Sequence, residues 1–314
     1  MRSPGIVLRS AAAVVLLVLT AAHAKADEPS RPSVGGHTFV STDLVADPFV
    51  RTFVRTSLGY AYAESIDYPP LVVAGDSLEM LDGSLSYATL GIEYQGALRE
   101  WIAARIGLGL VSRLGTQGSS LAHEGVTVTS GFDIGFLARL RETPKTMLSG
   151  TFGVTNQTVT IIDVKQFAED VAADVPNARL VDDVPTVRSS AGLRWAWAAS
   201  PSFGVTLLGQ GSYGDAPRRH EATSWGWDVG ASVDYDAAPK HRVPLGAAFA
   251  CRLSSTPGIT ATTDANSSQT VLRIAYTGRN DVVALDVLGV FNRDNAEATA
   301  IWAGGTAFSM RIYF

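Results

Sequence analysis

Apolar and polar residues alternate with a period of two along most of the chain after residue 51. The stretch from Val126 to Arg141 is the clearest example. One parity carries large apolar side chains, at Val126, Val128, Phe132, Ile134, Phe136 and Leu140. The other parity carries small or charged residues, with Leu137 as an exception: Thr127, Thr129, Gly131, Asp133, Gly135, Arg139 and Arg141. This period predicts a β-strand with one apolar face.

The alternation recurs in about twelve segments between residue 52 and the C-terminus, an even number within the 8 to 26 strands of transmembrane β-barrels. The connections between the segments alternate in length. Short ones fall around residues 96–99, 142–145, 199–201, 237–241 and 278–280. Longer ones fall around residues 65–83, 113–125, 161–185, 214–223, 254–269 and 292–297. Short periplasmic turns and longer external loops are the expected asymmetry of an outer-membrane barrel.

Aromatic residues of the apolar parity gather near the two ends of the predicted strands, as in the interfacial girdles of membrane barrels. With the N-terminus inside, the periplasmic girdle is Tyr94, Trp195, Trp197, Tyr235, Tyr276 and Phe314. The external girdle is Tyr60, Tyr62, Tyr213, Trp225, Trp227 and Phe291.

The polar parity separates a barrel from a secreted β-sandwich. In a sandwich that parity would face water and be rich in Lys, Glu and Thr. Here it is crowded with Gly, Ala and Ser, with Arg and Asp between them, which fits the interior of a closed barrel. We therefore predict an all-β fold, a transmembrane antiparallel up-and-down β-barrel, with a short helix in one external loop.

The N-terminus has the pattern of a secretory signal peptide. Arg2 and Arg9 precede the apolar run from Ala11 to Ala22, and small residues suited to cleavage follow. An uncleaved anchor is the alternative. The expected organisation is a signal peptide at residues 1–26, a periplasmic N-terminal segment at 27–51, and the barrel at 52–314. The single cysteine, Cys251, excludes an internal disulfide.

The C-terminal sequence AFSMRIYF ends a strand-like alternation on an aromatic residue. Together with the signal peptide and the strand-loop rhythm, it resembles the Gram-negative outer-membrane β-barrel proteins. In that superfamily the last strand carries an assembly signal that the barrel insertion machinery reads. The resemblance implies this role for Phe308, Met310, Ile312 and Phe314, although Ile312 is aliphatic where an aromatic is usual. The other implied partners are the lipid bilayer and lipopolysaccharide.

Charged residues of the inner parity are the candidate functional residues. They are Arg55, Glu93, Arg105, Asp133, Arg139, Arg188, Arg194, Asp228, Asp234, Arg252, Arg273, Asp286 and Arg311. Arginines outnumber acids, which favours a channel for passive transport of small polar solutes with a preference for anions. The alternatives are Arg–carboxylate pairs that only hold the barrel closed, a structural or adhesive barrel with a closed lumen whose external loops bind partners, and a carrier of lipid or hydrophobic compounds.

Two segments are candidates for closing the lumen. Val164–Val175 has a helical apolar face before Pro176, so it either folds into the mouth or lies on the rim. The segment Gly36–Phe49 precedes the first strand, and a tether, an extra strand and a lumen insert all fit its sequence.

Neither catalysis nor nucleic-acid binding is predicted. A barrel lipase or protease needs Ser, His and an orienting group together. Of the five histidines, His37 and His241 are expected on the periplasmic side, and His123 and His220 in external loops, near Ser119, Ser120 and Asp215. His123, Glu124 and Asp215 have no informative metal-ligand spacing, and no cofactor motif is present. No Lys/Arg cluster indicates phosphate binding.

Overall fold

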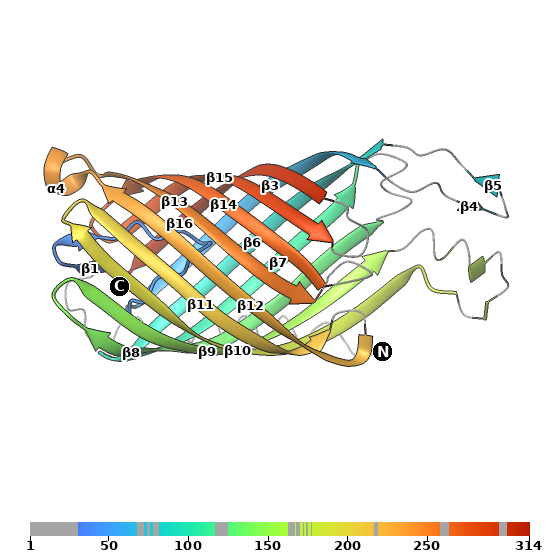
Figure 1. Ribbon diagram of the computed structural model, residues 1–314, viewed down its shortest axis with the longest axis horizontal. Helices are drawn as coiled ribbons and strands as arrows, with labels where there is room; N and C mark the ends of the chain where they lie inside the picture. Colours follow the sequence, from blue (N-terminus) through green and yellow to red (C-terminus); the bar gives the residue numbers. More distant parts are fainter. Residues whose placement is uncertain are drawn as a thin grey trace.

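The computed structural model describes residues 31–67, 72–73, 76–77, 82–116, 125–162, 167, 170–171, 173, 175–176, 178–216, 219–257, 264–294 and 300–314. Twelve strands form one closed barrel in which every strand pairs antiparallel with its neighbours. The last strand pairs with the first barrel strand and closes the seam (Figure 1). The predicted antiparallel barrel of about twelve strands is confirmed.

The barrel strands are β3 (Phe53–Asp67), β6 (Asp82–Arg99), β7 (Ile102–Gly115), β8 (Val126–Glu142), β9 (Thr146–Ile162), β10 (Val181–Ser200), β11 (Phe203–Ala216), β12 (Arg219–Asp236), β13 (Leu245–Pro257), β14 (Asp264–Thr277), β15 (Asp281–Asp294) and β16 (Ala300–Tyr313). Two small hairpins lie outside the barrel sheet: β1 (Ser33–Val34) with β2 (His37–Thr38), and β4 (Val72–Val73) with β5 (Asp76–Ser77). The helix α4 (Ala238–His241) joins β12 to β13. Among the described residues, no helix is long and apolar enough to span a membrane.

The two faces of the wall have the polarity that the alternation predicts. Large apolar side chains such as Leu58, Ile274 and Leu285 are more than half exposed on the outer face. Charged side chains such as Arg273 and Asp286, which are 2% exposed, are buried on the inner face. A water-soluble protein would have the opposite arrangement. Every barrel strand also exceeds the roughly nine to eleven residues that a tilted strand needs to cross a bilayer.

Short connections lie together at the end of the barrel that carries α4, called the α4 end here (Figure 1). Several strands run further toward the opposite end than the sequence predicts. Strands β11 and β12 extend to Ala216 and from Arg219, so most of the predicted loop 214–223 is strand. Likewise, β13 and β14 take up much of 254–269, and β15 reaches Asp294. Both faces are polar there, so the ladder continues without the alternation that reveals it.

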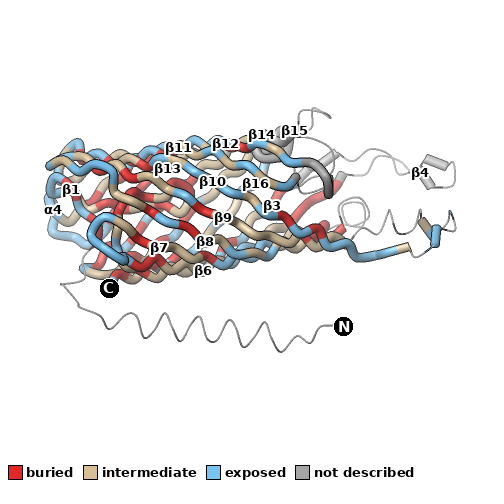
Figure 2. Tube along the Cα trace, turned by 90° about the horizontal axis from the view of Figure 1, so that it is seen from below, coloured by how far each residue is buried: buried red, intermediate tan, exposed pale blue. Residues whose placement is uncertain are grey.

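Residues 31–52, called the N-terminal insert here, run inside the barrel at its α4 end (Figure 1, blue). Figure 2 shows buried stretches within the barrel at this end. Phe39 and Val40 are at most 1% exposed, and they pack against small inner-face residues of the wall. Those residues include Ala196, Ala198, Ala248 and Ala275. Of the three arrangements that the sequence left open, the structure has the lumen insert.

Glycines on the inner face give the N-terminal insert the room it needs. A Cβ added at Gly204 would lie 2.5 Å from His37 Nε2 and 2.6 Å from Phe39 Cε1. One added at Gly246 would lie 2.6 Å from Val40 Cγ2. Such distances are well below van der Waals contact, so the wall is shaped to the segment that it encloses.

Candidate functional site

The lumen at the α4 end is the candidate functional site, because charged groups of the wall meet the N-terminal insert there. All of the predicted lumen charges point to the inner face. Arg55, Glu93, Arg105 and Asp133 form one chain across β3, β6, β7 and β8, with separations of 2.5 Å, 3.8 Å and 3.1 Å. Arg252 pairs with Asp228 at 2.8 Å and Arg273 with Asp286 at 2.7 Å.

Two of the predicted lumen arginines lie away from this centre. Arg139 pairs with Glu142 near the short turn between β8 and β9. Arg188 donates to the hydroxyls of Ser212 and Ser224 toward the opposite end. The remaining members, Arg194, Asp234 and Arg311, contact the N-terminal insert.

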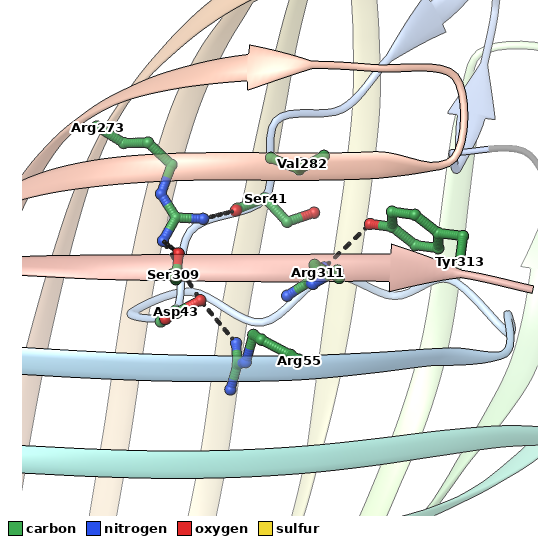
Figure 3. A pocket seen from close by; sticks show the side chains of 8 residues that line it. All are labelled: Ser41, Asp43, Arg55, Arg273, Val282, Ser309, Arg311 and Tyr313. Carbon is green, nitrogen blue, oxygen red and sulfur yellow. Dashed lines mark hydrogen bonds and ion pairs between the residues drawn. The ribbon is translucent and has the colours of Figure 1, made fainter. Parts of the chain in front are cut away.

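Asp43 is the first anchor of the insert (Figure 3). Its Oδ1 lies 2.8 Å from Nη1 of Arg55 and 3.3 Å from Nη2 of Arg273. Arg273 also donates to the carbonyl oxygen of Ser41. Burial alone would raise the pKa of the Asp43 carboxyl, but the charges of Arg55 and Arg273 outweigh it and lower that pKa to about 2. The carboxylate therefore stays ionised over the physiological pH range.

Asp47 is the second anchor. Its Oδ2 lies 2.7 Å from Nη1 of Arg311, in the last strand, and both side chains are 7% exposed. Its Oδ1 accepts the backbone N–H of Phe49 at 3.2 Å. Burial would raise the pKa of the Asp47 carboxyl, and the charge of Arg311 more than compensates, so that pKa is lowered. Arg311 also stacks over the ring of Phe53, 4.6 Å from its centroid.

The third anchor joins the insert to β12. His37 Nε2 lies 2.7 Å from Oδ2 of Asp234, and His37 Nδ1 lies 3.2 Å from the carbonyl oxygen of Pro201. Both ring nitrogens of His37 therefore lie within hydrogen-bond distance of an oxygen. The backbone N–H of Val40 donates to the same Asp234 oxygen at 3.0 Å. Arg31 pairs with Asp236 at 3.2 Å.

A cavity of about 160 Å³ lies between the N-terminal insert and the wall. The charged residues that line it are Asp43, Asp47, Arg55, Glu93, Arg105, Arg194, Arg252 and Arg311. Five arginines and three carboxylates line it, and two further carboxylates, Asp133 and Asp228, pair with Arg105 and Arg252 from outside the lining. A second cavity of about 10 Å³, around Ser41, Asp43 and Ser309 (Figure 3), is about the size of one water.

Midway along the wall, part of the inner face is accessible to solvent. Thr89 is exposed, and Val111 on the neighbouring strand is 42% exposed. Nothing among the described residues lies within 4 Å of a Cβ built on Gly109. Nearer the opposite end, inner-face residues such as Leu85 and Val159 are buried again.

The girdle residues lie on the outer face at the expected ends. Tyr276, Trp197 and Phe314 are 39–48% exposed near the α4 end, where Tyr94, Trp195 and Tyr235 also lie. Toward the other end, Trp225 is 76% exposed, and its ring centroid lies 4.8 Å from that of Tyr213. The other members of the external girdle lie on the same side: Tyr60, Tyr62, Trp227 and Phe291. Sequence analysis missed Trp302, 69% exposed and 4.4 Å from Phe291. The parity that Trp302 shares with Phe308 in β16 would have predicted its place in the external girdle.

The C-terminal strand follows its predicted parity. Phe308 and Phe314 are exposed on the outer face at 51% and 48%, and Met310 and Ile312 share that parity. Arg311 and Tyr313 point inward and are buried. No structural observation addresses the assembly signal, which stays a prediction.

Some of the residues considered for closing the lumen, for catalysis or for metal binding lie outside the described residues. Of the segment 164–175, the described residues Phe167, Asp170 and Val171 are helical, and Val171 is 55% exposed. His123, Glu124, Ser119 and Ser120 lie outside the described residues. His220 is in strand β12 rather than in a loop, because the ladder continues past the membrane-type alternation. His241 is exposed in α4. Within the described ranges, no group of three or more His, Cys, Asp or Glu is arranged to hold a metal.

Two anchors of the insert, Asp43 and Asp47, are residues that sequence analysis missed. They lie among apolar residues such as Val40, Leu44 and Val45. Carboxylates in an apolar segment need partners when they are buried. The two carboxylates in this segment, together with an inner face rich in arginine, were the sequence signal that could have predicted these ion pairs.

Comparison with known proteins bears on the fold. No protein-family model matches the sequence, and no curated protein matches it. An outer-membrane channel from Pseudomonas putida F1 superposes with a TM-score of 0.52 at 12% identity, covering 88% of this chain and 100% of that chain. The translocator domain of the autotransporter NalP from Neisseria meningitidis gives 0.48 at 10% identity, covering 84% and 88%. LpxR from Salmonella typhimurium gives 0.48 at 7% identity, covering 83% and 100%. The chain therefore has the fold of an outer-membrane β-barrel.

Proposed function

We propose that the protein is an outer-membrane channel for the passive transport of small polar solutes, with a preference for anions. The observation that carries this proposal is the cavity beside the N-terminal insert, where five arginines face three carboxylates. Charged rings of one sign set the selectivity of barrel channels. The superposed outer-membrane channel from Pseudomonas putida F1 supports the same class of function through its fold.

The N-terminal insert serves as the gate of this channel. Its residues fill the lumen at the α4 end, with Phe39, Val40 and Val45 at most 1% exposed. A solute that crosses the barrel must therefore pass a displaced or rearranged insert. The anchors at Asp43 and Asp47 hold the closed state, because they tie the insert to arginines on β3, β14 and β16.

The remaining parts of the proposal concern location. Residues 1–26 are removed as a signal peptide, the α4 end faces the periplasm, and the outer face contacts the bilayer and lipopolysaccharide. The exposed leucines and aromatics of the outer face support this assignment. The insertion machinery reads the tail Phe308–Phe314.

Single-channel recording in planar bilayers tests the proposal. We expect discrete openings of low probability in the wild type, and a reversal potential in a KCl gradient that reports anion preference. Cation preference would overturn the anion assignment alone. If neither the wild type nor a variant with a weakened anchor, Asp47→Asn, conducts, the channel proposal is wrong.

One observation favours a second candidate function. Because the insert occludes the α4 end, the barrel also suits a structural or adhesive role in which the loops at the opposite end bind partners. Absence of conductance in both proteins of the bilayer experiment would favour this role. The charged lining of the cavity argues against a carrier of lipid or hydrophobic compounds.

A further inference from the structure

Arg194 is a buried cation without a carboxylate partner in the described part of the chain. The residue is 5% exposed, on the inner face of β10. Its Nη1 donates to the carbonyl oxygen of Asp47 at 3.3 Å, and its Nε has no hydrogen-bond partner. A buried guanidinium without a counter-charge is costly, so an anion bound beside it would stabilise the structure.

The neighbouring carboxylates are already committed to other arginines. Asp47 binds Arg311 at 2.7 Å and the N–H of Phe49. Glu93 binds Arg55 at 2.5 Å, and its other oxygen lies 3.8 Å from Arg105. Neither carboxylate lies within ion-pair distance of Arg194.

The cavity of about 160 Å³ that Arg194 lines has room for a small ligand. Arg105 and Arg252 line the same cavity; Arg252 pairs with Asp228, and Arg105 pairs with Asp133 and lies 3.8 Å from Glu93. A guanidinium offers five donors, so both retain donors beyond these pairs. Gln210 adds an amide to the lining. The cavity thus combines an arginine-rich lining with spare donors.

We propose that this cavity binds one small oxyanion, a carboxylate or a phosphate, with Arg194 as its central ligand. The inference deepens the proposed channel function on which it rests, since a solute that crosses the lumen would meet this cavity. The bound oxyanion supplies the counter-charge that the Arg194 guanidinium lacks. Midway along the wall, inner-face residues such as Thr89 and Val111 are exposed to solvent.

Isothermal titration of the purified full-length mature barrel in detergent tests the inference. The buffer is Tris chloride, and the probes are sodium acetate, inorganic phosphate and, as a neutral analogue, acetamide. We expect saturable binding of acetate or phosphate with one site per barrel, and none of acetamide. Comparing the two anions separates carboxylate from phosphate recognition. Binding of neither anion, or equal binding of acetamide, overturns the inference with the wild type alone.

Matched variants assign the site. Arg194→Gln is expected to weaken binding by about tenfold to a hundredfold, the loss typical of removing a charge-assisted hydrogen bond. Arg139→Gln removes an inner-face arginine that does not line the cavity and should bind as the wild type does. Heat-modifiable mobility on gels verifies folding of each variant. Unchanged binding by folded Arg194→Gln overturns the assignment.

The anion-site proposal and the channel proposal can be refuted independently. Titration in detergent needs no transport, so binding without conductance in bilayers leaves the site standing and removes the channel. Conductance without binding of acetate or phosphate removes the site and leaves the channel.

Discussion

Replacing Asp47 by asparagine should open the barrel more often. The substitution keeps the shape of the side chain but removes the negative charge 2.7 Å from Arg311. Both groups are only 7% exposed, so the guanidinium of Arg311 would be left buried without its counter-charge. Removing one partner of a buried ion pair typically costs about 3–5 kcal/mol.

This cost falls on the closed state, because the insert carries Asp47 and the wall carries Arg311. Each 1.4 kcal/mol changes an equilibrium tenfold, so the ratio of open to closed barrels should rise by roughly 100- to 5,000-fold. The assay is open probability in planar bilayers, recorded at matched protein density. Raising the salt concentration should change the wild type little, since buried pairs are poorly screened.

Asp228→Asn is the matched control for Asp47→Asn. It removes a carboxylate that pairs with Arg252 within the wall and has no described contact with the insert. Its open probability should stay near that of the wild type. If Asp47→Asn is folded and opens no more often than Asp228→Asn, the buried ion pair does not hold the insert, and the reasoning is refuted.

Three further predictions concern the same molecule. Acidification should release the insert: the pKa of Asp43 is about 2 in the closed state and 3.8 when unperturbed, so its stabilisation is complete above about pH 4 and lost as the pH falls toward 2. Open probability that stays flat between pH 5 and pH 2.5 would contradict this. Gly204→Ala should displace the insert, because the new Cβ would lie 2.5 Å from His37 Nε2, whereas Gly109→Ala meets nothing within 4 Å and serves as its control. Increased protease cleavage of the insert in Gly204→Ala alone is the expected readout, and equal cleavage in both variants would count against the shape argument. Deletion of Phe314 should reduce insertion of the barrel into the outer membrane, measured as the heat-modifiable fraction in membrane extracts; undiminished insertion would show that this aromatic is not part of the assembly signal.

The wall of the barrel was predictable because successive side chains of a strand alternate between only two faces of the sheet. Val126–Arg141 shows this well, since its parity alone assigns lipid-facing and lumen-facing side chains. The ends of the strands were less predictable. Asp215 and Arg219 extend β11 and β12 beyond the region where one face must be apolar. Hydrogen bonding of the backbone continues there without any demand on the side chains.

Pairing inside the lumen depends on information that alternation does not carry. Arg273 and Asp286 are direct neighbours across β14 and β15, so knowing the register would have predicted that pair. Asp47 and Arg311 lie 264 residues apart and meet only because the insert enters the closed barrel. The segment 36–49 has no regular period, and its three candidate arrangements could be separated only by tertiary structure.

Closure of the barrel has a consequence for the order of folding. The N-terminal insert leads directly into β3, one side of the seam, and its Asp47 binds Arg311 of β16, the other side. Phe53 and Tyr313 also meet across the seam, with ring centroids 5.9 Å apart. The two strands that are furthest apart in the chain, and therefore entropically the most expensive to join, are bridged by a segment that belongs to neither. Capture of the insert by the last strand would thus turn two separate late steps, sealing the cylinder and filling it, into one cooperative event.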